Sequence, residues 1–121
     1  MSLVAAIDHV QLAAPPGCEG PARAFFGGVL GLEELEKPKS LRARGGVWFR
    51  CGGQELHVGV EEPFEPARKA HPGFRAGDLD ELRARLEQAG AEPRDDTSIP
   101  GLRRFYVDDP FGNRLEFLDA A

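Results

Sequence analysis

Residues 103–119, RRFYVDDPFGNRLEFLD, contain two strand patterns separated by a turn pattern. Polar and apolar residues alternate along 103–108 and again along 114–118, as expected for strands with one buried face. DPFGN, residues 109–113, contributes the Pro and Gly that interrupt strands. The segment is therefore predicted to be a β-hairpin with one polar and one apolar face.

A helix and two further strands are predicted before this hairpin. Asp78 as N-cap, Glu81 three residues later and Gly90 at the end indicate a helix with a capping box. HPGFRA, residues 71–76, precedes the helix and is interpreted as a strand. AEPR, residues 91–94, begins a weaker strand.

The same order of elements occurs in the first half of the chain. Its predicted elements are a strand over 5–13, a helix from Pro21 to Gly31, and strands over 32–36, 47–51 and 54–60. Residues 37–46 are expected to be a loop or weak edge, and Gly52-Gly53 is a two-residue hairpin turn. Residues 61–70 contain two prolines and are interpreted as a linker. The prediction is one domain over 1–121, with an α+β fold of two βαβββ modules at about 5–60 and 71–118.

Four residues stand out on the predicted polar strand faces: His9, His57, His71 and Glu116. His9 and His71 open the two modules, 62 residues apart, and His57 and Glu116 lie on the last strands, 59 residues apart. A lone strand histidine is more often a hydrogen-bonded bystander. Two matched pairs instead indicate a metal site in a common cavity, because imidazole and carboxylate bind zinc and other first-row metals.

Composition excludes several other functions. The net charge of −5 comes from interspersed charges of both signs, so no nucleic-acid-binding footprint is present. No apolar run could cross a membrane, and the N-terminus lacks a signal-peptide pattern, which predicts a cytoplasmic protein. Cys18 and Cys51 do not form a disulfide framework, and neither has the pattern of a nucleophile.

The chain resembles the vicinal oxygen chelate superfamily, which includes glyoxalase I, fosfomycin- and bleomycin-resistance proteins, methylmalonyl-CoA epimerase and extradiol dioxygenases. The resemblance is carried by the segments IDHVQLAAP, FFGGVLGLEE, HPGFRAGDLDELRARLEQAG and RRFYVDDPFGNRLEFLD. The most specific part is DPFGNRLEFLD. The resemblance implies that the two modules form a curved, barrel-like mixed sheet with a central cleft. It also implies a homodimer.

The resemblance further implies that the metal ligands are His9, His57, His71 and Glu116. Zinc, nickel, cobalt, manganese and iron are all compatible with this set. Glu116 would also be the catalytic base. Predicted substrate contacts are Gln11, Trp48, Glu55, Arg75, Tyr106 and Arg114. Each of these arginines could hold an anionic substrate, although an ion pair at the rim is the commoner role.

Three functions stay open. The first is a glyoxalase-like, metal-dependent lyase, isomerase or transferase acting on a small oxygenated substrate, which the strand histidines favour. The second is a metal-free binding protein of the bleomycin-resistance type, with a ligand held against Trp48, Phe49, Phe64 or Tyr106. The third is a fold that persists with a vestigial site.

Differences between this chain and particular members of the superfamily reduce the number of expected activities. The chain has no further histidine for extradiol cleavage. Glyoxalase I usually has a carboxylate at the position of His57, and no glutathione site is evident. The potassium-loop and phosphonate-binding residues of fosfomycin-resistance proteins are not evident either.

Overall fold

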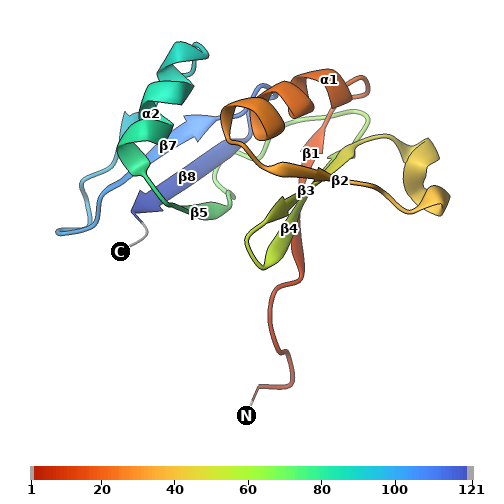
Figure 1. Cartoon of the computed structure of the whole chain (residues 1–121), viewed down its shortest axis with the longest axis horizontal. Coiled ribbons are helices and arrows are strands. Elements are labelled where there is room, and N and C mark those ends of the chain that lie inside the picture. Colours follow the sequence, from red (N-terminus) through yellow and green to blue (C-terminus); the bar gives the residue numbers. More distant parts are fainter. Residues whose placement is uncertain (1, 120–121) are drawn as a thin grey trace. The chain divides into compact units, whose positions relative to one another are not determined.

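The computed structural model describes residues 2–119, which divide into two compact units, one up to Phe64 and the other from Glu65. Each unit contains one four-stranded mixed sheet, with strand order β1-β4-β3-β2 in the first and β5-β8-β7-β6 in the second (Figure 1). The predicted α+β class and the repeated βαβββ order are confirmed. Among the described residues, no helix has the length and hydropathy needed to cross a membrane.

The helices and strands are as follows. The first unit contains β1 His9–Ala14, α1 Glu19–Ala22, the π-helix η1 Arg23–Val29, β2 Glu33–Leu35, the 3₁₀-helix η2 Lys39–Arg44, β3 Val47–Cys51 and β4 Gln54–Val60. The second contains β5 Gly73–Ala76, α2 Leu79–Gln88, β6 Arg94–Asp95, β7 Arg104–Asp108 and β8 Arg114–Asp119.

The core of the first unit lies between one sheet face and the helical segment α1–η1. Phe26 of η1 is fully buried, and its ring lies 5.8 Å from that of Phe49 on β3. Leu56 and Val58 of β4 are buried on the same face. Because side chains alternate along a strand, the opposite face carries the predicted polar residues.

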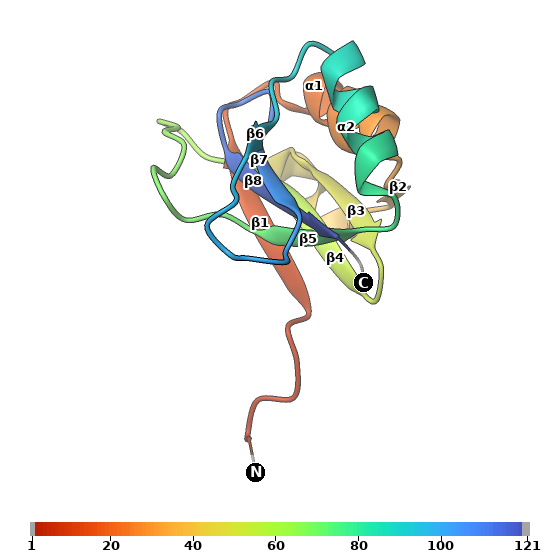
Figure 2. The ribbon, with the colours of Figure 1, turned by 90° about the vertical axis from the view of Figure 1, so that its left-hand side faces the viewer.

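The core of the second unit is built in the same way, with α2 against the apolar face of its sheet (Figure 2). Asp78 caps α2 as predicted, since its Oδ1 accepts a hydrogen bond of 3.0 Å from the backbone N–H of Glu81. Leu86 of α2 is fully buried. In the β7–β8 turn, Asp109 accepts hydrogen bonds of 2.9 Å from the backbone N–H groups of Phe111 and Asn113.

Two predicted strands begin later than expected. The first strand starts at His9 rather than at residue 5, because its pairing with β4 begins at His9, opposite Glu55. The carbonyl of the preceding residue, Asp8, accepts the 3.2 Å hydrogen bond from Glu55 N that begins this pairing. β5 starts at Gly73, so His71 and Pro72 precede the strand. Pro72 has no N–H to donate, although its carbonyl accepts from Glu116 N at 3.0 Å.

Two other segments also differ from expectation. The first helix is confirmed, but it begins at Glu19, and most of it has π geometry, with Leu30 N donating to Phe25 O. Its double glycine, a poor α-helix former, lies in this π segment. The expected loop over 37–46 instead contains η2, which turns the chain from β2 towards β3.

Candidate functional site

Glu116 is the centre of a polar cluster in the second unit. It lies on β8 between Gly73 of β5 and Tyr106 of β7, and it is only 8% exposed. Its Oε1 lies 2.8 Å from His71 Nε2, and its Oε2 accepts a hydrogen bond of 3.1 Å from Arg104 Nη1. The predicted pair of His71 and Glu116 is therefore in direct contact.

Both ring nitrogens of His71 face acceptors. Nδ1 lies 2.8 Å from the backbone carbonyl oxygen of Lys69, which can only accept, so Nδ1 carries a proton. Nε2 faces the carboxylate of Glu116, which also only accepts when ionised. Each ring nitrogen of His71 thus lies within hydrogen-bonding distance of an oxygen, and Nε2 is the nitrogen that a cation shared with Glu116 could bind.

The surroundings of Glu116 keep it ionised. Burial by itself raises the pKa of its carboxyl, but hydrogen bonds from His71 and Arg104 outweigh burial, so the pKa lies below its ordinary value of 4.5. At neutral pH the side chain is a carboxylate with one oxygen directed at an imidazole and the other at a guanidinium.

Arg104 is a further member of this cluster that the sequence pattern did not predict. Its guanidinium lies 3.1 Å from Tyr106 Oη and from Asp96 Oδ2, in addition to its bond with Glu116. Its Nη2 also donates to Ser98 Oγ at 2.9 Å, while its buried Nε has no hydrogen-bond partner among the described residues. The period of two along β7, counted back from Tyr106, places Arg104 on the same face and could have identified it.

Two predicted substrate contacts belong to this cluster and one lies further along the sheet. The ring of Tyr106 lies 5.2 Å from that of His71, and the Arg114 guanidinium lies 5.4 Å from the centre of the Tyr106 ring. Arg75 is exposed on β5 and pairs with Leu118.

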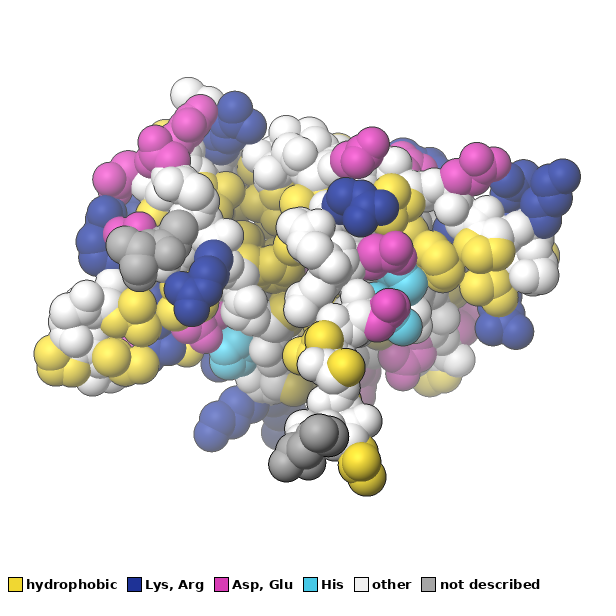
Figure 3. Space-filling model, turned by 60° about the horizontal axis from the view of Figure 1, so that its bottom comes forward, with side chains coloured by type: hydrophobic (Ala, Val, Ile, Leu, Met, Phe, Trp, Pro, Cys, Tyr) yellow, Lys and Arg dark blue, Asp and Glu magenta, His cyan; other side chains and the backbone are white. Residues whose placement is uncertain are grey.

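In the first unit, three rings form a stack. The ring of His57 lies between that of Trp48, at 3.8 Å, and that of His9, at 4.4 Å, with nearly parallel planes. His57 is 5% exposed, and its Nε2 lies 2.9 Å from Glu55 Oε1. His9 is about half exposed, and its Nδ1 lies 2.9 Å from Asp8 Oδ1. Figure 3 shows histidine atoms reaching the surface beside acidic side chains.

The strand register places the pair His9 and His57 in the first unit at the same relative positions as the pair His71 and Glu116 in the second. Gln11, two residues after His9, pairs with His57. Gly73, two residues after His71, pairs with Glu116. The side-chain contacts differ, however, because rings stack in the first unit, whereas an imidazole meets a carboxylate in the second.

Within either unit, the described residues contain no group of three His, Cys, Asp or Glu side chains arranged as a metal site. The described residues are therefore not arranged as a metal centre, but the chemistry of the donors is suitable. The Nδ1 atoms of His9 and His71 each face an oxygen, and hydrogen bonding at this nitrogen is the usual support for metal binding through Nε2. The prediction that all four residues meet at one metal stays a prediction.

The aromatic residues expected to hold a ligand lie in different environments. Trp48 is partly exposed on the polar face of β3. Phe49, the next residue, is fully buried in the core, so its expected contact with a ligand is wrong, because neighbouring strand residues point to opposite faces. Phe64 is partly exposed outside the sheet.

Neither cysteine has the environment of a nucleophile. Burial raises the pKa of the thiols of Cys18 and Cys51, and both are free thiols. Both therefore remain protonated near neutral pH.

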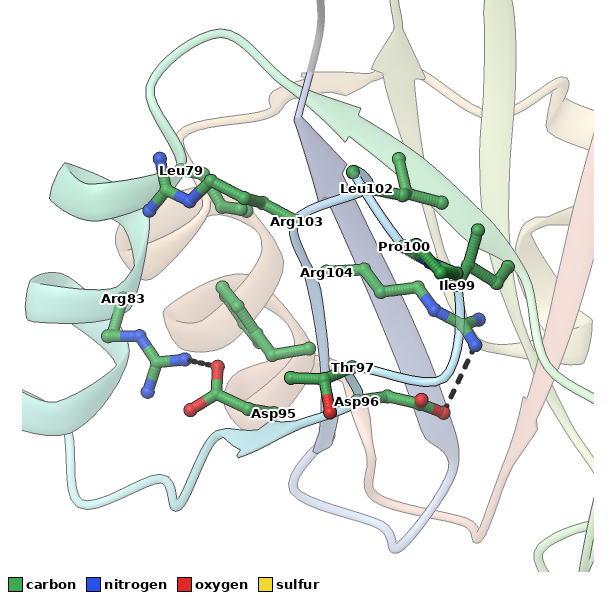
Figure 4. A pocket seen from close by; sticks show the side chains of 12 residues that line it. Leu79, Arg83, Asp95, Asp96, Thr97, Ile99, Pro100, Leu102, Arg103 and Arg104 are labelled. Carbon is green, nitrogen blue, oxygen red and sulfur yellow. Dashed lines mark hydrogen bonds and ion pairs between the residues drawn. The ribbon is translucent and has the colours of Figure 1, made fainter.

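A pocket of about 400 Å³ lies in the second unit between α2 and the segment before β7 (Figure 4). Arg83 forms an ion pair with Asp95 there, and Arg104 forms one with Asp96. These charges are thus already paired within the pocket wall.

A family model described as a glyoxalase-like domain matches residues 18–118. The chain belongs to the glyoxalase-like domain family. Its folded form is similar to a Bacillus anthracis protein assigned to the glyoxalase family, with 52% identity, a TM-score of 0.94 and 98% of each chain covered. The resemblance to the vicinal oxygen chelate superfamily is thereby confirmed.

Other solved structures share the glyoxalase-like fold. Lactoylglutathione lyase from Agrobacterium tumefaciens is 25% identical, with a TM-score of 0.74, and 98% of this chain and 96% of that chain are covered. FosX, a fosfomycin resistance protein from Listeria monocytogenes, is similar in a complex with Mn(II) and dihydroxypropylphosphonic acid. That structure is 18% identical, with a TM-score of 0.81 and coverage of 98% and 95%, and it shows similarity of fold alone. No curated protein matches the chain.

Proposed function

We propose that this glyoxalase-like protein is a divalent-metal-dependent enzyme, a lyase, isomerase or transferase, that acts on a small oxygenated substrate. The cation would be held by His9, His71 and Glu116. The observation that carries the proposal is the contact between His71 Nε2 and Glu116 Oε1, in which the other ring nitrogen is fixed by a backbone carbonyl.

The spacing and chemistry of this pair fit a shared cation. Two ligand atoms at about 2.1 Å from one metal lie about 3–3.4 Å apart in octahedral or tetrahedral geometry. The observed separation of 2.8 Å is close to this range, so the two side chains need to move little. Because Arg104 occupies Oε2, Glu116 would bind through Oε1 alone.

His9 would supply a second imidazole from the first unit. Asp8 accepts from its Nδ1, which leaves the Nε2 lone pair available for a metal. His57 has its Nε2 on Glu55 and its ring between two others, so we propose that it supports the ring of His9. Coordination by His57 would require Glu55 to move.

A divalent cation bound there supplies Lewis-acid stabilisation of negative charge on a substrate oxygen. The chain's own groups supply the rest. Glu116, ionised at neutral pH, would serve in turn as a ligand and, when its Oε1 is free, as the acceptor of a proton from a substrate atom. Arg104 holds that carboxylate in one orientation and donates to Tyr106 Oη, whose ring packs edge-on against His71.

The names of similar proteins support a metal-dependent reaction without defining it. One FosX structure contains Mn(II), and lactoylglutathione lyase is a lyase by name. Zinc, nickel, cobalt, manganese and iron remain candidates, since imidazole and carboxylate accept all of them.

Elemental analysis of protein purified without added metal tests the proposal. We expect close to one equivalent of a first-row divalent metal in the wild type and loss of most of it in His71→Ala and Glu116→Gln. Glu87→Gln, which removes an exposed carboxylate from α2, is the matched control and keeps the metal. A wild type without metal that also fails to bind added Zn²⁺ or Mn²⁺ would overturn it.

A metal-free binding protein is the second candidate. It is favoured by the absence of a three-ligand group within either unit, among the described residues. In a metal-free binding protein, ligand binding should survive both chelator treatment and the loss of His71. In a metal-dependent enzyme, either change should abolish metal-dependent binding of the ligand.

We also propose that the protein is a homodimer, as the superfamily resemblance implies, and that it acts in the cytoplasm. Light scattering coupled to size exclusion measures the assembly directly. A mass equal to the 13.2 kDa monomer across the working concentration range would contradict it.

A further inference from the structure

A second pocket, of about 240 Å³, lies on the polar side of the sheet in the first unit. Its wall includes Gln11 of β1, Trp48 of β3 and Gly59 of β4, which face the same way as His57 because they follow the strand period. Lys37, two residues before η2, and Arg44, the last residue of η2, also line the pocket.

The charges of this pocket all have one sign. Lys37 and Arg44 line it, and none of the described Asp or Glu residues does, although the chain as a whole has a net charge of −5. A larger pocket of about 610 Å³ in the same unit has both signs in its wall, with Glu19, Glu34 and Arg23 among its residues. The smaller pocket is therefore the one that favours an anion.

The two cations retain donors for a ligand. The Arg44 guanidinium forms no hydrogen bond or ion pair with any described residue, whereas Arg42 of the same short helix is paired with Glu36. Lys37 donates to the carbonyl oxygen of Gly45 and has two further N–H bonds. A planar guanidinium with unused donors suits bidentate binding of a carboxylate.

The rest of the wall suits a flat, apolar body. The Trp48 indole contributes an aromatic surface, and Leu41 contributes an aliphatic one. Gly59 leaves space for the Gln11 amide, since a Cβ at Gly59 would lie 2.5 Å from Gln11 Nε2. The volume is below the range of about 300–1,000 Å³ usual for drug-sized ligands, so the ligand is small.

We propose that this pocket binds a small organic acid, with its carboxylate on Arg44 and Lys37 and its body against Trp48. Trp48 stacks on His57, which stacks on His9, so a ligand here lies two rings from a proposed metal ligand. The inference rests on the proposed function in treating this acid as the substrate class, while acid binding itself requires no metal.

Trp48 is the single tryptophan of the chain, so its fluorescence reports on this pocket directly. The test titrates chelator-treated, full-length protein with benzoate and with benzamide, its neutral isostere, and calorimetry checks the affinities. We expect benzoate to bind about tenfold or more tightly than benzamide, because only the carboxylate can form charge-assisted bonds. Arg44→Gln should remove this preference, whereas Lys39→Gln, a cation on the same helix outside the pocket wall, should keep it.

Equal affinity for benzoate and benzamide in the wild type, no binding of either, or the same loss in both variants would overturn the inference. Metal content, measured on the same preparations before chelation, separates the two proposals. A protein that contains no metal, fails to bind added Zn²⁺ or Mn²⁺ and retains the preference for benzoate rejects the metal-dependent function and keeps the acid pocket. A metal-containing protein without the preference for benzoate rejects the acid pocket and keeps the metal-dependent function.

Discussion

At the scale of single residues, Glu116 is a buried charge held by its neighbours. Its carboxylate has a proton-bearing imidazole on one oxygen and a guanidinium on the other, and these outweigh the cost of burial. A folded-state pKa below the unfolded one means that Glu116 stabilises the protein above its unfolded pKa. The stabilisation is lost as pH falls through the folded pKa.

Glu116→Gln should therefore reduce the free energy of unfolding in a pH-dependent way. Near pH 7 we expect a loss of about 1–3 kcal/mol, because a buried network loses its anion. The difference from the wild type should shrink as pH falls below the ordinary pKa of 4.5. Urea denaturation of chelator-treated protein across this range measures it, with Glu87→Gln as the exposed control. A loss of the same size at all pH values would contradict the account.

The contribution of Arg104 to the hydrogen-bond network around Glu116 can be tested with the neighbouring Arg103 as a control. Arg104 bridges Glu116 to Asp96, whereas the exposed Arg103 pairs with Asp80 at the surface. Lysine has one compact ammonium group and cannot span the oxygens that the guanidinium reaches. Arg104→Lys should cost about 2 kcal/mol in urea denaturation, and Arg103→Lys less than about 0.5 kcal/mol. Equal costs would show that the network does not depend on the fork of Arg104.

The three histidines and Glu116 could be predicted as candidate site residues from the sequence, because each is a polar residue within or beside a clear strand pattern. The sequence could not give their contacts. Arg104 was missed because one arginine among many looks like a surface charge, and its burial depends on Asp96 and Glu116 from other segments. Phe49 was misjudged as a ligand contact because aromatic character was given more weight than the strand period.

At the scale of elements, α2 shows how local sequence determines a boundary. Asp78→Ala should destabilise the protein by about 1 kcal/mol, since the N–H of Glu81 loses its acceptor. Asp78→Asn keeps an acceptor oxygen and should restore most of the stability. Thermal unfolding of the three proteins checks this. Equal destabilisation by Ala and Asn would show that the charge of Asp78, rather than its cap, is what matters.

The element boundaries that were wrongly predicted from the sequence include those set by pairing with another strand. Alternation continues before His9, but the strand begins only where β4 offers a partner. The segment over 37–46 has no clear period, and its 3₁₀ turns were not predicted. By contrast, the Gly52-Gly53 hairpin and the start of α2 were predicted because the turn and cap chemistry are local.

At the scale of the whole molecule, the chain repeats one βαβββ pattern, and both copies place the same register positions on their polar faces. The copies differ chemically. The first presents a stack of rings beside a cationic pocket, and the second presents a carboxylate between an imidazole and a guanidinium. Among the described residues, no three His, Cys, Asp or Glu side chains are grouped as a metal site.

The proposed metal site requires one divalent cation to bind donors from both copies. Crystals grown with Mn²⁺ or Zn²⁺, measured at the absorption edge of the metal, test it most directly through anomalous density. We expect a single strong peak at about 2.0–2.2 Å from the Nε2 atoms of His9 and His71 and from one oxygen of Glu116. Density that shows His71 still bonded to Glu116, with no anomalous peak near either side chain at saturating metal, would contradict it.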